Sequence, residues 1–420
     1  MISFLARQFH QIRSEGPPAL WRKLGKLLLL PFRAFPYAVA IPAVLLVRGI
    51  RPILWIRFGP IRSDVLGHFI FNPAYYLCRR KDIPSPSRDL FYFEHNPPVN
   101  AQWALMVRRA LTVHPLTYYL DHTNRLIPGG TGHFVRLLPE GRGSIDPEGI
   151  LAQSEPHIRF TAEEERLGRR FLEDTGICQG GRFVCLIVRD SAFKNSIHSS
   201  VDWSHHDYRD SDITTFKNAA VALAEKGYWV LRMGKIVRDS FPVSHPRIID
   251  YANSGVRNDF LDIWLVARCE FAVTTGTGLD EVCTVFRSPY VHVNQLPVGG
   301  IRSFTPSLVT FKCLKWRSTG APLSLREQIS TGSIYALHKQ KYDDLGIEIV
   351  DNTPEEIMEA VLEFEAVRNG SYEATPEDLE LQEKFWATLG GWADFSRYHR
   401  EIKATVSPSF LRNSHLWFLI

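Results

Sequence analysis

The sequence predicts an α/β protein with two facing Rossmann-like domains, a basic and apolar N-terminal arm, and C-terminal helices. A length of 420 residues, 45% of them hydrophobic, exceeds what one compact core usually needs. Beyond residue 176, short apolar runs alternate with helical segments, which is typical of a doubly wound parallel sheet. We expect the arm over residues 1–50, Rossmann-like domains over 51–175 and 176–350, and a helical tail over 351–420.

The N-terminal arm is strongly basic. Over residues 1–62, which include the arm, the single acid Glu15 stands against ten basic residues: Arg7, Arg13, Arg22, Lys23, Lys26, Arg33, Arg48, Arg51, Arg57 and Arg62. This imbalance indicates an anionic partner, either nucleic acid or a membrane surface. The apolar residues at 27–30 and 37–47 favour the membrane, so we expect no nucleic-acid partner.

The apolar run in the arm is interrupted. A spanning helix needs about 20 mostly uncharged residues, whereas Arg33, Pro31, Pro36 and Pro42 lie inside this run. We expect an interfacial or re-entrant membrane attachment, with a transmembrane helix or a buried packing arm as alternatives. The run starts late and no clear small-residue cleavage site follows it, unlike in a cleaved signal peptide.

After the arm, alternating strand and helix patterns predict the first α/β domain. The predicted elements are a strand at 52–58, a helix at 65–76, a strand at 91–93, a helix at 100–111, a loop-rich stretch at 128–147 and a helix at 162–172. Thr161 is a suitable N-cap for the last of these helices.

The second half alternates more regularly. It predicts strands at 183–188, 228–233, 247–251, 271–274 and 290–294, and helices at 213–226, 259–269 and 279–287. Asp212 or Ser211 suits the N-cap of the helix at 213–226, and Gly227 suits its end. In the tail, Thr353 and Thr375 each precede a proline, which is typical of a helix start.

Polar and cationic residues follow four strands of this predicted sheet. The carboxyl ends of parallel strands meet at one edge, where ligands bind. The residues there are Arg189, Asp190, Lys194, Arg232, Gly234, Lys235, Asp250 and the turn after residue 274. They suit a diphosphate held by charge-assisted hydrogen bonds. Alternatively, Arg189 and Arg232 pair with Asp190, Asp212 or Asp250 in a surface network.

The turn after residue 274 is the most specific part of that edge. It consists of Thr275, Gly276, Thr277 and Gly278. Glycines let a ligand approach the backbone, threonine hydroxyls add donors, and free N–H groups at a helix start favour anions, so we expect a phosphate or sugar-nucleotide site. Glu281 suits either both hydroxyls of a ribose or the helix dipole.

Asp210-Ser211-Asp212 matches the DxD pattern with which metal-dependent glycosyltransferases hold a divalent ion. Such a pattern normally ends an apolar strand, but here a polar segment precedes it and a helix follows, so helix capping is favoured. Tyr208 and Arg209 in the same loop are candidates to clamp a donor or an acceptor. We expect no metal site and no cofactor.

Two residues are candidate bases. His68 follows the first predicted strand, and a histidine with a near-neutral pKa there suits deprotonation of an acceptor hydroxyl. Asp64, in the preceding loop, is the rival base. The alternative for His68 is a histidine whose hydrogen bonds are satisfied within helix packing.

The six cysteines show neither a CxxC pair nor a metal-ligand spacing with histidine, and several lie in apolar runs. They predict buried free thiols in a reducing compartment rather than disulfides or a zinc site.

Several of these segments resemble bacterial glycosyltransferases of surface-polysaccharide gene clusters. The resemblance covers about residues 50 to 365 and rests on Val188-Arg-Asp190, Asp207–Asp212, Lys226–Gly234, Asp250-Tyr-Ala252, Asp259–Asp262, Thr275–Leu279, Gly67-His68 and Asn72-Pro73. It implies a sugar-nucleotide donor and a two-Rossmann (GT-B) architecture, as in heptosyltransferases and fucosyltransferases. Thr275 and Thr277 replace the expected serines but keep the hydroxyls.

The residues and the resemblance together predict a metal-independent glycosyltransferase. The N-terminal domain would bind a saccharide or lipid-linked acceptor, and the C-terminal domain would bind a nucleotide-sugar donor. Arg189, Lys194 and Arg232 would neutralise the leaving diphosphate. The arm would attach a cytoplasmic enzyme to the inner membrane surface. A non-catalytic binding component of a membrane assembly and a metal-dependent transferase using Asp210 and Asp212 are the alternatives.

Overall fold

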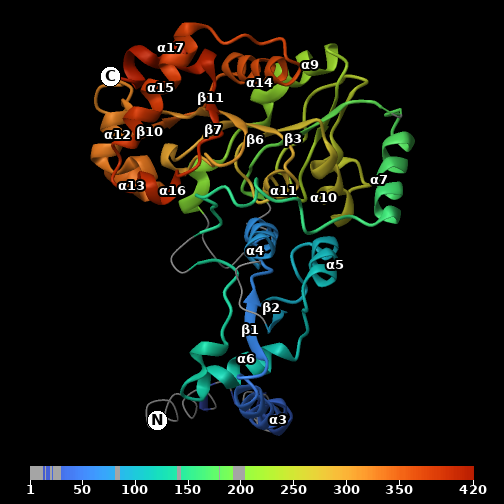
Figure 1. Cartoon of the computed structure of the whole chain (residues 1–420). Helices are drawn as coiled ribbons and strands as arrows, with labels where there is room; N and C mark the ends of the chain where they lie inside the picture. Colours follow the sequence, from blue (N-terminus) through green and yellow to red (C-terminus); the bar gives the residue numbers. More distant parts are fainter. Residues whose placement is uncertain are drawn as a thin grey trace. The chain divides into compact units, whose positions relative to one another are not determined.

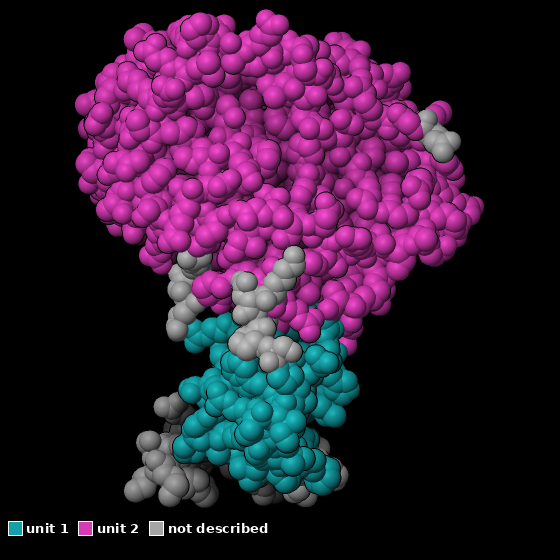
Figure 2. All heavy atoms as spheres, viewed as in Figure 1, with its two compact units in different colours: residues 1–61, 82–94, 111–136 teal, residues 62–81, 95–110, 137–420 magenta. Residues whose placement is uncertain are grey.

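The structure is a computed structural model that describes residues 13–14, 16–18, 21, 30–80, 86–139, 143–178, 180–192 and 204–420. The chain forms two compact units (Figure 2). Unit 1 comprises residues 1–61, 82–94 and 111–136, and unit 2 comprises residues 62–81, 95–110 and 137–420. These units divide the chain at other positions than the predicted domains, whose boundaries stay a prediction.

Unit 2 is built on a seven-stranded parallel sheet with the order β11-β8-β7-β6-β3-β4-β5. The strands are β3 (Phe183–Ile187), β4 (Trp229–Arg232), β5 (Ile248–Ile249), β6 (Phe271–Thr274), β7 (Tyr290–Gln295), β8 (Ser307–Phe311) and β11 (Thr405–Val406). The chain enters at the central strand β3, winds outward to β5, and returns to the other side of β3 with β6. The predicted α/β class and doubly wound parallel sheet are confirmed.

Helices lie on both faces of this sheet, as Figure 1 shows for α9 and α14 on one face and α10 and α11 on the other. The described helices of unit 2 are α4 (Leu66–Arg79), α5 (Ala101–Ala110), α7 (Ala162–Asp174), α9 (Lys217–Glu225), α10 (Asp259–Arg268), α11 (Glu281–Phe286), α12 (Leu325–Thr331), α13 (Lys339–Asp344), α14 (Pro354–Arg368), α15 (Pro376–Gly390), α16 (Phe395–Tyr398) and α17 (Pro408–Phe418). The helices predicted in the second half and in the tail are confirmed within a few residues.

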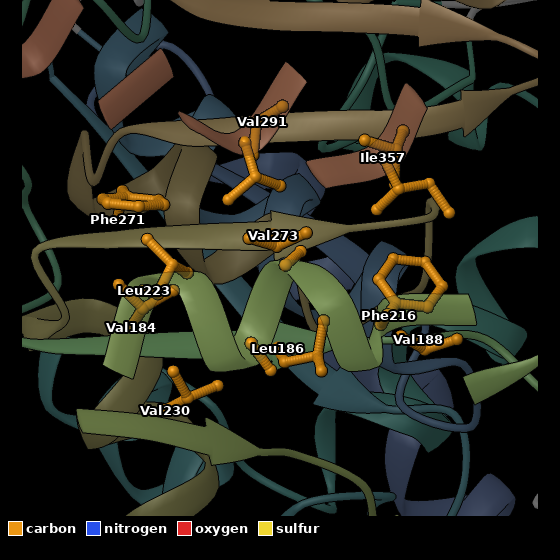
Figure 3. Close-up of a cluster of buried hydrophobic side chains, with 14 of the residues drawn as sticks. Val184, Leu186, Val188, Phe216, Leu223, Val230, Phe271, Val273, Val291 and Ile357 are labelled. Carbon is orange, nitrogen blue, oxygen red and sulfur yellow. The ribbon is translucent and has the colours of Figure 1, made fainter. Parts of the chain in front are cut away.

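The core between the sheet and the helices α9 and α14 explains the continuous apolar runs of the strands. Val184, Leu186, Val273 and Val291 project from β3, β6 and β7, and α9 covers them with Phe216 before its first residue and Leu223 within it (Figure 3). Each of these side chains is at most 3% exposed. Strands buried on both faces read as unbroken hydrophobic segments because neither side of the pleat meets water.

Local sequence signals set several helix starts. Thr161, Ser324, Thr353 and Thr375 each form a capping box with the acidic residue three positions later. Asp212 accepts a hydrogen bond from the Thr214 backbone N–H and so caps the short helix η4 (Ile213–Phe216). The predicted capping roles of Thr161, Asp212, Thr353 and Thr375 are confirmed.

A two-stranded antiparallel sheet accompanies the main sheet of unit 2. It pairs β9 (Cys313–Trp316) with β10 (Ile347–Val350). A separate core, with Val406 of β11 and residues of α15 and α17, lies beside the main sheet and includes Phe385 and Leu411, both fully buried. The sequence did not predict β8 to β11 or α17.

Unit 1 contains a short parallel sheet of β1 (Trp55–Ile61) and β2 (Ser87–Phe93), with the helices α3 (Leu30–Gly49) and α6 (Thr117–Leu126). Arg57 on β1 pairs with Asp89 on β2 at 2.7 Å. Arg48 donates hydrogen bonds to the backbone carbonyls of Asn124, Ile127 and Pro128 at the end of α6. Arg48 and Arg57, from the basic set near the N-terminus, are therefore held by partners within unit 1.

Helix α3 takes up most of the apolar run of the arm, including Pro36 and Pro42. It packs against α6, yet Phe35, Val39 and Leu46 are 68%, 54% and 66% exposed. Arg7, Arg22, Lys23 and Lys26 lie outside the described residues. Within the described part of the chain, no helix is both long enough and apolar enough to cross a membrane.

Candidate functional site

The winding direction of the main sheet reverses between β3 and β6. In an open α/β sheet, this switch point opens a crevice at the carboxyl ends of the two strands. Here the two ends are joined directly, because the Arg189 backbone N–H donates to Thr275 Oγ1 at 2.8 Å and the Thr275 N–H donates to the Ile187 carbonyl at 3.2 Å. The Arg189 backbone therefore lies against the glycine turn, and the binding of a ligand by the two together stays a prediction.

The turn from Thr274 to Asp280 is stabilised by its own side chains. Thr274 Oγ1 accepts from the Gly276 N–H at 3.1 Å, and Asp280 Oδ2 accepts from the Thr277 N–H at 3.1 Å. Thr277 Oγ1 accepts from the Leu279 N–H. Side-chain oxygens therefore already accept from the N–H groups of Gly276, Thr277 and Leu279, and anion binding at the turn stays a prediction. The α11 helix that follows has only six residues.

Gly276 has a φ of +82°, which favours glycine. Its carbonyl accepts a hydrogen bond from Arg209 Nη2 at 2.7 Å. A Cβ atom at Gly276 would lie 3.0 Å from His292 Nε2 and 3.4 Å from Arg209 Nη2. The Arg209 guanidinium and the His292 imidazole thus both lie beside Gly276.

Arg209 is a largely buried cation. Among the described residues, no carboxylate oxygen lies within 4 Å of its guanidinium, and burial together with the charge of Arg189 lowers its pKa. An unpaired charge in such an environment is costly. Arg209 therefore provides a positive charge at the switch point that an anionic ligand could neutralise.

Arg189 is the second cation at this point. Its Nε atom lies 3.1 Å from Asp210 Oδ1, and its side chain is 11% exposed. Lys312 Nζ donates to the Asp210 backbone carbonyl at 2.7 Å and pairs with Asp351 at 2.8 Å. Of the two DxD carboxylates, Asp210 thus pairs with an arginine and Asp212 caps a helix.

A cluster of buried ionisable side chains lies at the start of α11, the helix that follows the turn. Arg302 Nη2 lies 2.5 Å from Glu281 Oε1, and Arg302 Nη1 lies 3.8 Å from Asp280 Oδ1. Asp280 Oδ1 and Glu281 Oε2 are buried without a hydrogen-bond partner. Burial raises the pKa of Glu281 to about 8, although the charge of Arg302 opposes this shift.

His292 and Arg302 are site residues that sequence reasoning missed. His292 lies inside the apolar strand β7, where its register partner is Thr274, and burial with the charges of Arg302 and Arg209 lowers its pKa to about 3. It is therefore neutral. His292, Asn294 and Gln295 are polar residues within the buried strand β7 and were the available signal, whereas nothing local distinguishes Arg302.

The first residues of α4 lie against the glycine turn. A Cβ atom at Gly278 would lie 2.7 Å from the Gly67 backbone nitrogen and 3.3 Å from its Cα atom. Two glycines therefore permit direct backbone contact between α4 and the turn, both in unit 2. His68 follows Gly67, so the candidate base and the glycine turn belong to one compact unit.

His68 begins a chain of hydrogen bonds. Its Nδ1 atom lies 2.7 Å from Ser144 Oγ, and the Ser144 hydroxyl donates to Asn72 Oδ1 at 2.9 Å. Because the Ser144 proton is committed to Asn72, Ser144 Oγ accepts from Nδ1–H, which leaves Nε2 as the unprotonated nitrogen. Burial, with the charge of Arg62, lowers the pKa of His68, so the imidazole is neutral at pH 7.

Asp64 is placed differently from His68. Its carboxylate accepts from Arg62 Nε at 3.1 Å and lies 3.7 Å from His95 Nδ1. Burial raises the pKa of Asp64, but the hydrogen bond and the charge of Arg62 outweigh this effect, so the pKa is lowered overall. A carboxylate that is already paired and holds its proton weakly is a poorer base than the neutral imidazole of His68.

Other predicted residues lie in separate contacts. Arg232, 1% exposed, pairs with Asp250 at 3.2 Å and donates to the Asp239 carbonyl. Gly234 lies beside Val237. Arg232 thus pairs with Asp250, as the alternative prediction stated. These contacts give no support to the diphosphate-binding roles predicted for Arg232, Gly234 and Asp250.

Tyr208 is 5% exposed and lies in an apolar cluster, with its ring centroid 5.6 Å from that of Tyr342. Its predicted ligand contact finds no support in this position. Lys194 lies outside the described residues. In the described parts of the chain, no group of three or more His, Cys, Asp or Glu residues is arranged to hold a metal ion. The cysteines described are free, and Cys78, Cys185, Cys269 and Cys283 are buried as predicted.

No family model and no curated protein matches the chain. Among solved structures, it is similar to the glycosyl transferase family 9 protein from Veillonella parvula DSM 2008, with 14% identity over 61% of this chain and 86% of that chain and a TM-score of 0.40. It is also similar to E. coli ADP-heptose lps heptosyltransferase II, with 12% identity over 74% of this chain and 100% of that chain and a TM-score of 0.40. A third similar structure is E. coli heptosyltransferase WaaC with ADP, with 10% identity over 61% of this chain and 91% of that chain and a TM-score of 0.29. TM-scores this low carry no argument about this chain.

Proposed function

We propose that the protein is a glycosyltransferase that binds a nucleotide-diphosphate sugar at the switch point between β3 and β6. The observation that carries the proposal is Arg209, a largely buried guanidinium held on the Gly276 carbonyl, with no carboxylate within 4 Å among the described residues. An anionic ligand placed there would neutralise this charge. The resemblance of the segments 207–212 and 275–279 to glycosyltransferases supports the same ligand class.

In the proposed reaction, the acceptor hydroxyl forms a bond to the anomeric carbon of the donor sugar, and the bond from that carbon to the diphosphate oxygen breaks. Negative charge grows on the leaving diphosphate. Arg209 and Arg189 stabilise that charge without reorganisation, because the Gly276 carbonyl and Asp210 already orient their guanidinium groups. The proposal requires no metal ion for this role.

His68 is the proposed base. Its Nε2 atom takes the proton of the acceptor hydroxyl, while Ser144 and Asn72 keep the proton of the imidazole on Nδ1. Ser144 and Asn72 are thus positioning residues. Asp64, paired with Arg62, is the weaker candidate.

We further propose that unit 1 holds the enzyme on an anionic membrane surface, where lipid-linked acceptors are present. The exposed Phe35, Val39 and Leu46 on α3 support this proposal. Vesicles of phosphatidylcholine with phosphatidylglycerol should co-sediment the protein, and replacing these three residues by serine should abolish that binding. Equal binding of the triple variant would reject this role for α3.

Donor binding is tested with the purified full-length protein and a panel of nucleotide sugars and nucleoside diphosphates. A ligand at 100 times its dissociation constant stabilises the fold by about 2.7 kcal/mol, which a thermal-shift screen detects. Arg209→Gln should remove the shift, whereas Arg317→Gln, which changes an exposed arginine of the same unit, should keep it. The absence of a shift with any diphosphate, or an unchanged shift in Arg209→Gln, would reject the site.

Turnover separates the proposal from its alternatives. Release of the nucleoside diphosphate with a saccharide or lipid-linked acceptor is expected, and it should persist in excess chelator. Loss of activity with chelator would favour the metal-dependent alternative. Saturable donor binding without transfer or hydrolysis with any acceptor would favour a non-catalytic binding component.

A further inference from the structure

A cavity lies at the edge of the main sheet opposite the candidate site. It has a volume of about 680 Å³ and opens where β7, β8 and β11 begin, since Pro289, Ser307 and Thr405 line it. Because the strands are parallel, this edge carries their amino ends, whereas the proposed donor site lies at their carboxyl ends. Cavities of a few hundred cubic ångströms accommodate small organic molecules.

The lining of the cavity is mainly apolar with cationic side chains at intervals. Phe304, Leu308 and Phe364 contribute apolar surface, and Arg287, Arg368 and Lys403 contribute positive charge. One acid also lines the cavity, Asp378, but its carboxylate already accepts from Arg412, Tyr372 and the Thr375 N–H. Of the cations, Arg368 lies 3.8 Å from Glu270 and Lys403 lies 3.4 Å from Glu401, so Arg287 is the lining cation that has no carboxylate within 4 Å among the described residues.

Arg287 distinguishes this cavity from an incidental gap. Its guanidinium donates to the backbone carbonyls of Val285 and Ser154, and no carboxylate of the described chain lies within 4 Å of it. An arginine that lines a cavity without a carboxylate partner is suited to bind an anion.

The backbone of Arg287 adds an independent observation. Arg287 follows the last residue of α11 with a φ of +60°, a left-handed conformation that glycine usually provides at this position. A residue with a side chain pays a steric cost in this conformation. The arginine side chain thus occupies a position where the backbone alone favours glycine.

We propose that this cavity is a binding site for an amphipathic anion, a molecule with an apolar body and a single phosphate or carboxylate group. The apolar side chains cover the body, and Arg287 binds the anionic group with Arg368 and Lys403 nearby. The site is separate from the proposed donor site and does not depend on it.

Calorimetric titration of the full-length protein with decyl phosphate, decanoate and decanol, all below micelle-forming concentrations, tests the proposal. One saturable site for decyl phosphate, decanoate or both is expected, with decanol at least about tenfold weaker, since a charge-assisted hydrogen bond is lost. Preference for one anion identifies the head group. Equal binding of decanol, or no binding of either anion, would overturn the proposal.

Two variants locate the site. Arg287→Gly removes the cation at a position where glycine relieves the backbone, so the fold should persist while affinity for the anions falls about tenfold or more. Arg287→Gln provides a second neutral replacement. Arg317→Gln should bind the probes as the parent protein does. Unchanged affinity in both Arg287 variants would place the binding elsewhere. Donor binding at the other edge should be unaffected in every variant, which keeps the two proposals separable.

Discussion

At the scale of single residues, Arg209 and Arg287 share an unusual environment. Both are at least partly buried, and both donate to backbone carbonyls where the other buried arginines of unit 2, such as Arg302, face carboxylates. Burial lowers the pKa of each. Because an unneutralised cation in a protein interior is costly, each marks a place where an anion would stabilise the fold.

His68 should set the pH dependence of transfer. A base acts only when unprotonated, so kcat/KM should fall as pH falls through the His68 pKa, which burial holds below its ordinary value of about 6.5. His68→Gln should lower kcat by a factor of about 10² to 10⁴. A transfer assay from pH 5 to 8 measures both effects, and an unchanged rate in His68→Gln would exclude it as the base.

Ser144→Ala should lower kcat by about tenfold through the loss of one hydrogen bond that orients the imidazole. KM should stay constant and the acid limb of the pH profile should move. Ser371→Ala, which changes an exposed serine of unit 2, is the matched control. A purely structural role of Ser144 would lower thermal stability without moving the pH profile.

Gly278→Ala should destabilise unit 2. The added Cβ atom would lie 2.7 Å from the Gly67 nitrogen, and both partners are backbone, so neither can move away cheaply. We expect a loss of about 1–3 kcal/mol in the free energy of unfolding, measured by urea denaturation. Gly390→Ala, at a glycine with open space around it, should not be destabilising. Equal stability of the two variants would contradict the close contact.

At the scale of elements, Gly168 shows how tertiary packing overrides helix propensity. It lies within α7, where alanine would ordinarily stabilise the helix by about 1 kcal/mol. A Cβ atom there would lie 2.1 Å from the Trp264 ring on α10. Gly168→Ala should therefore destabilise the protein by about 1–3 kcal/mol in thermal or urea unfolding. Stabilisation instead would mean that α7 does not pack on Trp264.

Elements with local signals were predictable, and elements that depend on distant partners were not. The strand at Phe271–Thr274 begins and ends as predicted, because a buried parallel strand is a short apolar run with a glycine turn after it. The strand at Thr405–Val406 was missed because it has only two residues, and pairing with β8 rather than its own pattern makes it a strand.

At the scale of the whole molecule, buried histidines should make the fold sensitive to acid. Burial lowers the pKa of His292 to about 3 and that of His399 to about 4. In the unfolded chain both take up protons near pH 6.5, so the native state binds fewer protons and its stability falls as pH drops below about 6.5. For His399 alone the loss is up to about 3 kcal/mol.

Replacing His399 tests this pH dependence. His399 accepts from the Ser303 hydroxyl and donates to the Gly299 carbonyl, so glutamine can keep part of this bonding without titrating. Urea unfolding of His399→Gln should depend less on pH between 4 and 6.5 than that of the parent protein. His338→Gln, at an exposed histidine, should leave the pH dependence unchanged. Parallel pH curves for all three proteins would contradict the prediction.

The sequence predicted the edge of the sheet where the candidate site lies, because alternating strand and helix patterns indicate a parallel sheet and parallel strands end on one side. It did not predict which side chains there face a ligand. Arg189 and Arg232 look alike in sequence, yet one lies beside the glycine turn and the other pairs with Asp250. Such choices depend on loop paths and on residues as remote as Arg302, which no local pattern encodes.

The backbone contact between Gly67 and Gly278 has a mechanical consequence. Helix α4 cannot slide over the turn without one glycine backbone colliding with the other, so His68 and the groups around Gly276 must move as one rigid body. Both belong to unit 2. A displacement of α4 within unit 2 would therefore shift the glycine turn with it, so the spacing between His68 and Gly276 stays constant.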